Sequence, residues 1–264
     1  MFQKVEERIA ASRSIVEKQA KFFERRFGRV DSQWKYDGSR VTEADLNISN
    51  ALQRQLKSQF PEDLFLSEET DPEKGTVVLD TEYTWLVDPI DGTNNFARGI
   101  PACAISLALL RDGVPVYGII YDHMSRSLIH GGPGAGVFVG DRKIQVSFES
   151  PSVHCIVGAQ HCEIGERESD DRALQRMFKI RNLGSSAIQL AYVSVGWLDG
   201  VVAHRVNSWD IAAGVALIRE VKGDIKYFDS DPFPLMQFDV KKPSFGYAAG
   251  SPAILKQILA AIDR

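Results

Sequence analysis

The segment Trp85-Leu86-Val87-Asp88-Pro89-Ile90-Asp91-Gly92-Thr93-Asn94-Asn95-Phe96 joins an apolar run to two carboxylates and a Gly-Thr turn without interruption. The apolar part has the composition of a buried strand, which we expect to end at Asp88. Gly92 lets the backbone approach a ligand closely, and the amides of Gly92 and Thr93 would face a phosphate if they open a helix. The segment therefore predicts a strand whose C-terminal end carries a metal- and phosphate-binding turn.

Asp88 and Asp91 are suited to a hard divalent cation, since Mg²⁺ prefers oxygen ligands at about 2.0–2.1 Å. The stiff Pro89 between them would let the two carboxylates converge on neighbouring ions while the carbonyl of Ile90 faces one of them. The alternative is an ordinary acidic turn, because Asp-Pro and Asp-Gly are common turn dipeptides.

Three further acidic residues favour the metal site. Glu68 follows the short apolar run 64–67, so two predicted strands deliver carboxylates to their C-terminal ends. Asp45 lies in the first turn of a helix predicted from Thr42 to Pro61, and Asp210 opens an apolar helix predicted over about 209–221. For Asp45 and Asp210 the alternative is helix capping, which contributes about 0.3–1 kcal/mol.

The remaining chain alternates helices and strands. We expect an amphipathic helix over 2–27, an antiparallel meander over 102–148, a strand near 153–158, helices near 169–178 and 186–197, and a strand at 200–204. These ranges predict an α/β protein in one compact unit. Residues 1–150 would form an α+β half with most metal ligands, and residues 151–264 an α/β half with Asp210 and the substrate pocket.

The composition is that of an ordinary folded globular protein, with 264 residues, 44% hydrophobic and 25% charged. A net charge of -4 gives no basic field for nucleic acid or a membrane surface. Neither a signal peptide nor an apolar span of about 18 residues is recognisable. The three cysteines, Cys103, Cys155 and Cys162, include no CxxC pair and predict reduced thiols. We expect a cytoplasmic protein whose partner is a small phosphorylated metabolite, with no nucleic-acid or membrane partner.

An ordered set of motifs resembles the inositol monophosphatase family, part of the Mg²⁺-dependent, Li⁺-inhibited phosphatase superfamily. The set comprises Asp45, Glu68-Glu69, Asp88–Thr93 and Trp209-Asp210-Ile211-Ala212-Ala213-Gly214, with 35–39 and Val41-Thr42 before it and Gly184-Ser185-Ser186-Ala187 within it. The resemblance implies a layered α/β/α/β/α sandwich of the sugar-phosphatase type and a homodimer.

The resemblance also implies roles for individual residues. Glu68, Asp88 and the Ile90 carbonyl would hold one Mg²⁺, and Asp88, Asp91 and Asp210 a second. Glu68 would share a third ion, giving two or three Mg²⁺ per active site. The catalytic residues would be Asp45, Thr93 and Glu68, with Thr93 and Asp45 orienting and deprotonating the attacking water. Substrate contacts are expected from Gly92, Thr93, Gly184, Ser185, Ser186 and Arg205.

The resemblance implies a Mg²⁺-dependent phosphomonoesterase acting on inositol phosphate or a related small sugar phosphate. Inositol-cleaving members often carry an acidic residue seven positions before Asp210, where this chain has Ala203, followed by His204 and Arg205. These two cations could contact a second anionic group, or could form a solvated strand end. Alternative substrates are fructose 1,6-bisphosphate, histidinol phosphate, 3'-phosphoadenosine 5'-phosphate and NADP. An alternative of another class is a non-catalytic interaction protein on the same scaffold.

Overall fold

The computed structural model describes residues 2–34, 40–148, 150–160, 168–241 and 244–262. The motif at residues 35–39 and Cys162 lie outside this part of the chain. Cys103 and Cys155 are buried free thiols, as predicted. Among the described helices, none combines the length and the apolar character that crossing a membrane requires.

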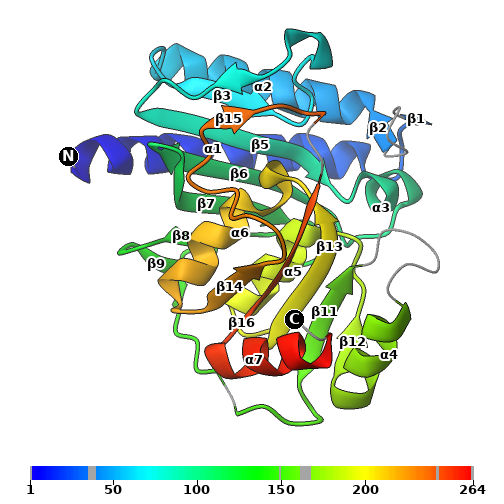
Figure 1. Ribbon diagram of the computed structural model, residues 1–264. Helices are drawn as coiled ribbons and strands as arrows, with labels where there is room; N and C mark the ends of the chain where they lie inside the picture. The colour runs from blue at the N-terminus through cyan, green and yellow to red at the C-terminus, as the bar shows by residue number, and fades with distance from the viewer. Residues whose placement is uncertain (1, 35–39, 149, 161–167, 242–243, 263–264) are drawn as a thin grey trace.

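Helices and sheets alternate in five layers (Figure 1). Helices α1 (Phe2–Arg26) and α2 (Glu43–Gln59) cover the outer face of a seven-stranded sheet. Helices α5 (Ser186–Ser194) and α6 (Ser208–Glu220) lie between this sheet and a five-stranded one. Helices α4 (Glu168–Met177) and α7 (Pro252–Ala261) cover the far side. The predicted α/β/α/β/α sandwich is confirmed.

The seven-stranded sheet has the order β10-β9-β8-β7-β6-β5-β3. Strands β3 and β5 run parallel, with Ser67 opposite Val87, so the residues that follow these positions emerge at the same end of the sheet. The meander from β6 onward is antiparallel, as predicted. The strands are β3 (Leu64–Ser67), β5 (Tyr83–Asp91), β6 (Ala104–Arg111), β7 (Val114–Asp122), β8 (Ser127–Gly132), β9 (Gly136–Val139) and β10 (Arg142–Ile144).

Strand β5 is longer than the sequence predicted, because it continues past Asp88 to Asp91. Its pairing with β6 shifts register between these two residues, where Pro89 has no N–H to give to the ladder. Both carboxylates are therefore carried by the backbone of a buried strand, which fixes them more firmly than a surface turn would.

The five-stranded sheet has the order β12-β11-β13-β16-β14. Strand β11 is parallel to both β12 and β13, and β16 is antiparallel to β13 and β14. The C-terminal elements β14, β16 and α7 were not predicted. The strands are β11 (Ile156–Gln160), β12 (Lys179–Arg181), β13 (Gly200–Val206), β14 (Asp224–Tyr227) and β16 (Phe245–Gly250).

Short elements complete the fold near the ends of β3 and β5. They are the ribbon of β1 (Ser32–Trp34) and β2 (Arg40–Thr42), the ribbon of β4 (Val77–Val78) and β15 (Gln237–Phe238), the 3-10 turn η1 (Pro72–Lys74), and helix α3 (Thr93–Arg98). In the β4–β15 ribbon, a strand that precedes residue 150 in the sequence pairs with one that follows it. The division of the chain into halves at that residue stays a prediction.

Candidate active site

A cavity of about 570 Å³ opens where the end of β5 meets the starts of α3 and α6. All five predicted metal ligands line it, namely Glu68, Asp88, Ile90, Asp91 and Asp210. Residues from both sides of position 150 line it, so its chemistry depends on the packing of α6 against the seven-stranded sheet.

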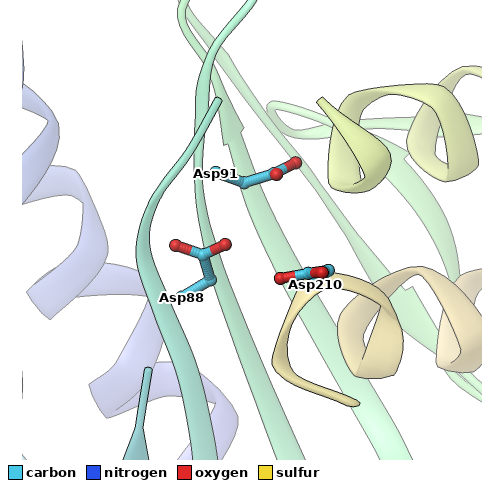
Figure 2. Close-up of side chains that lie close together, drawn as sticks. All are labelled: Asp88, Asp91 and Asp210. Atoms are coloured by element: carbon cyan, nitrogen blue, oxygen red, sulfur yellow. The ribbon is translucent and has the colours of Figure 1, made fainter. Parts of the chain in front are cut away.

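Three carboxylates converge at this cavity, and Figure 2 shows their side chains directed toward a common space. One oxygen each of Asp88, Asp91 and Asp210 lies within 4.8 Å of the other two. Asp88 and Asp91 come from β5, whereas Asp210 stands in the first turn of α6, where its Oδ2 accepts a hydrogen bond of 2.8 Å from the Asn207 amide. One oxygen of Asp210 thus caps the helix, as the alternative interpretation expected, and the other oxygen does not take part in capping.

The electrostatics of the three carboxylates call for a cation. Burial, followed by the negative charges of Glu68, Asp91 and Asp210, raises the pKa of Asp88 well above its usual value. Burial also raises the pKa of Asp91 to about 6, although the Ser185 hydroxyl and the Ala187 amide donate to it and oppose the shift. Within the described ranges, no Lys, Arg or His forms an ion pair with any of the three aspartates.

A second pair, Thr93 and Asp45, lies beside this cluster. The Thr93 hydroxyl is 3.3 Å from Asp45 Oδ1 and 2.9 Å from the Ile90 carbonyl oxygen. Asp45 Oδ2 accepts hydrogen bonds from the amide and hydroxyl of Thr42, which forms a capping box at the start of α2. Burial raises the pKa of Asp45 to about 7, so this carboxylate can take up a proton near neutral pH.

Gly92 forms the turn that joins the two groups. Its φ of 83° lies in the left-handed region, and a Cβ there would stand 3.0 Å from the Ala102 carbonyl oxygen and 3.1 Å from that of Gly184. Both facts favour glycine at this position. Helix α3 begins at Thr93, so the Gly-Thr pair does open a helix, which is the condition for its amides to face a phosphate.

The predicted substrate-binding residues fall into two groups. Gly92, Thr93 and Gly184 line the cavity. Ser185 and Ser186 are buried behind its wall, where Ser185 caps α5 and donates to Asp91. The Ser186 hydroxyl donates to Gln160 Oε1 over 2.8 Å. In this structure the two hydroxyls hold other side chains in place.

The segment from Ala203 to Arg205 does not line the cavity. Ala203 is fully buried. His204 lies 3.9 Å from Asp170 of α4 and packs against Phe228, and Arg205 is exposed. His204 and Arg205 are therefore not brought to the cluster of Asp88, Asp91 and Asp210.

Several lining residues were missed by the sequence analysis, among them Trp34, Arg40, Gln160 and Asn207. The Arg40 guanidinium lies 4.2 Å from the ring centre of the exposed Trp34. Gln160 ends β11 after an apolar run, much as Asp88 follows one in β5. That position at a strand end is the one local signal that could have found it.

Comparisons with known proteins agree with this geometry. The inositol-1-monophosphatase of Mesorhizobium japonicum is 32% identical, over 91% of this chain and 90% of its own length. The fructose-1,6-bisphosphatase of Pyrococcus furiosus is 34% identical, over 79% and 83%. The crystal structure of the extragenic suppressor protein suhB from Bartonella henselae superposes with a TM-score of 0.81, at 27% identity and over 94% and 95% of the two chains.

The profile of one family covers nearly the whole sequence. It matches residues 2–263 and describes the inositol monophosphatase family. The match includes every segment that lines the cavity. The chain therefore belongs to the inositol monophosphatase family of metal-dependent phosphoric monoester hydrolases.

Proposed function

We propose that this protein is a Mg²⁺-dependent phosphomonoesterase that hydrolyses inositol phosphate or a related small sugar phosphate. The observation that carries the proposal is the convergence of Asp88, Asp91 and Asp210 beside the Thr93–Asp45 pair in one cavity. A non-catalytic protein that kept the metal site for structure would need the three aspartates but not the Thr93–Asp45 pair beside them, so the presence of that pair favours catalysis.

The donor set fits Mg²⁺. The cluster offers carboxylate oxygens and lacks sulfur and imidazole, which is the ligand preference of a hard cation. Asp88, Asp91 and Asp210 would hold one ion, and Glu68 with the Ile90 carbonyl would complete the positions for one or two more. When bound, Mg²⁺ lowers the pKa of a water ligand and stabilises charge on the phosphate and the leaving oxygen.

The protein groups would position and deprotonate the attacking water. The Thr93 hydroxyl donates to the Asp45 carboxylate over 3.3 Å, and both groups can contact one water that lies beside them. Asp45 is the proton acceptor, since Thr42 holds its Oδ2 and leaves Oδ1 toward Thr93. Glu68 acts as the third catalytic residue from the end of β3, where it adds negative charge beside Asp45 and Asp88.

Fructose 1,6-bisphosphate is the second candidate substrate. Two relatives with that activity in their names, from Pyrococcus furiosus and Thermotoga maritima, are 34% and 32% identical to this chain. Both candidate substrates present a phosphate ester on a hydroxyl-rich carbon skeleton, so the same cavity could take either.

Phosphate release from a panel of phosphorylated metabolites tests the proposal. Inositol 1-phosphate and fructose 1,6-bisphosphate should be hydrolysed with Mg²⁺, and a chelator should abolish the release. Histidinol phosphate, 3'-phosphoadenosine 5'-phosphate and NADP belong in the same panel. Absence of hydrolysis across the panel in Mg²⁺ would overturn the proposed function.

Mg²⁺ should also stabilise the fold. At one hundred times its Kd, an ion that binds the folded state alone raises the free energy of unfolding by about 2.7 kcal/mol. Thermal unfolding at increasing Mg²⁺ concentration measures this effect. A melting temperature that is independent of Mg²⁺ up to high millimolar concentration would contradict a Mg²⁺ site in the cavity.

The quaternary structure belongs to the same proposal. On the resemblance to the family, we propose a homodimer that has no nucleic-acid or membrane partner. Sedimentation velocity distinguishes a dimer from a monomer of 29.4 kDa.

A further inference from the structure

Gln160, the last residue of β11, brings an amide to the active-site cavity. Its side chain is half-buried and lines the cavity together with Gly184 and Asp210. The attack of water on a phosphate, as described above, makes no use of this side chain. The contacts of its two polar atoms indicate which role the amide has.

The carbonyl oxygen of Gln160 is held by two buried donors of α5. Oε1 accepts a hydrogen bond of 2.8 Å from the Ser186 hydroxyl and one of 3.2 Å from Gln189 Nε2. Ser186 and Gln189 are 1% and 0% exposed. A carbonyl oxygen has two lone pairs, so both acceptor positions of Gln160 are used on the protein side.

The amide nitrogen of Gln160 is left for a ligand. In the described part of the chain, no residue accepts a hydrogen bond from its Nε2. Nε2 is not a buried atom without a partner. It faces the cavity and is accessible to a molecule there. Two N–H groups in a fixed orientation form a donor site for oxygen acceptors.

Neighbouring positions do not offer such a group. Ala203, which lies beside Gln160 in the register of β11 and β13, is apolar and buried. His204 packs toward Asp170, and the exposed Arg205 does not line the cavity. Gln160 is therefore the polar side chain that these two strands present to the cavity.

We propose that Gln160 is a specificity-determining residue that donates from Nε2 to an oxygen on the alcohol part of the substrate. The acceptor is a hydroxyl or a second phosphate of a sugar phosphate. This inference rests on the proposed phosphatase function and adds the recognition of the leaving group to it.

Gln160→Glu tests the donor directly, since a carboxylate accepts the hydrogen bonds of Ser186 and Gln189 but has no N–H. The value of kcat/KM is measured for inositol 1-phosphate and fructose 1,6-bisphosphate relative to phenyl phosphate, whose leaving group has no hydroxyl or second phosphate. The ratios should fall roughly three- to tenfold, the effect of one lost hydrogen bond, and mainly through KM. Unchanged ratios would overturn the proposal.

The two sugar substrates distinguish the two acceptors. A larger loss with fructose 1,6-bisphosphate identifies the second phosphate, because the new carboxylate repels it. Equal losses identify a hydroxyl. Gln160→Met, which removes the donor without adding charge, should lower the same ratios and serves as the matched variant. Wild-type enzyme that hydrolyses neither phenyl phosphate nor any member of the metabolite panel would refute the proposed phosphatase function itself.

Discussion

Asp63 and Asp88 are both 2% exposed, yet among the described residues only Asp63 is paired with a cationic side chain of the protein. Asp63, near the start of β3, accepts two hydrogen bonds from the Arg8 guanidinium at 2.6 and 2.9 Å and one from the Trp85 indole at 2.9 Å. Asp88, near the end of β5, accepts one hydrogen bond from the Ile90 amide and is surrounded by other carboxylates.

The difference supports a structural role for Asp63 and, on the proposed function, a role in metal binding for Asp88. The Arg8 guanidinium also lies over the Tyr83 ring at 4.0 Å, so the pair with Asp63 is enclosed and complete. In the described part of the chain, Asp88 has no such protein cation. Buried charges are paired or coordinate metals, and the second region needs a cation from solution.

Removing the Asp88 charge should have the largest effect. Asp88→Asn should lower kcat/KM by about a thousandfold or more, which corresponds to about 4 kcal/mol of transition-state stabilisation. The same variant without metal should melt at a higher temperature than the metal-free wild type, because it removes repulsion among buried carboxylates. Turnover and calorimetric unfolding measure the two effects. Near-normal turnover would exclude Asp88 from the metal site.

Thr93→Ala addresses the chemistry beside the metal ligands. Loss of the hydroxyl that faces Asp45 should lower kcat by about a hundredfold, since positioned proton transfer contributes about 10² to 10⁴. KM should change little, because the contact is made mainly in the transition state. Steady-state kinetics with inositol 1-phosphate decide the matter, and an effect on KM alone would assign Thr93 to phosphate binding instead.

Arg8→Met should act on stability and spare catalysis. It leaves the Asp63 charge buried without its cation, a change that typically costs about 3–5 kcal/mol. The double variant Arg8→Met/Asp63→Asn should recover part of the loss, because no unpaired charge remains. Denaturant unfolding and kcat are measured on both variants. A normal free energy of unfolding for Arg8→Met would mean that this ion pair is not structural.

The sequence predicted the parts of the site that depend on local order. Acidic residues at or just after the ends of strands, and a helix with Asp210 in its first turn, follow from apolar runs and capping signals of a few residues. The convergence of these acidic residues in space does not follow from local patterns, because it depends on the packing of α6 between two sheets. In this chain the convergence was implied only by the resemblance to a family.

Local patterns do not show a residue's role where the surroundings decide it. Ser185 and Ser186 lie in a motif expected to contact substrate, yet their hydroxyls point to Asp91 and Gln160. Gln160 carries no charge and no motif, so its place in the cavity depends on β11 lying parallel to β13. The terminal strands β14 and β16 are stabilised by pairing with distant segments, which short windows of sequence do not contain.

A third buried titratable group, His130, needs neither a protein partner of opposite charge nor a metal ion, because it stays neutral. It is 1% exposed, with Nδ1 2.7 Å from the Tyr117 hydroxyl and Nε2 2.9 Å from the Gly140 carbonyl oxygen. Burial lowers its pKa from 6.5 to about 4. The unfolded chain therefore takes up a proton at this residue between pH 6.5 and about 4 that the folded chain does not, and the contribution of His130 to stability falls as the pH falls through this window.

His130→Gln isolates this contribution, because the amide can donate and accept but does not titrate. The difference in unfolding free energy between wild type and variant, measured from pH 7.5 to 4, removes the carboxylate titrations that both share. We expect wild type to lose stability relative to the variant by at most about 1.4 kcal/mol per pH unit below pH 6.5. A difference that stays constant with pH would mean that His130 is protonated in the folded protein as easily as in the unfolded chain, and that its burial does not select the neutral ring.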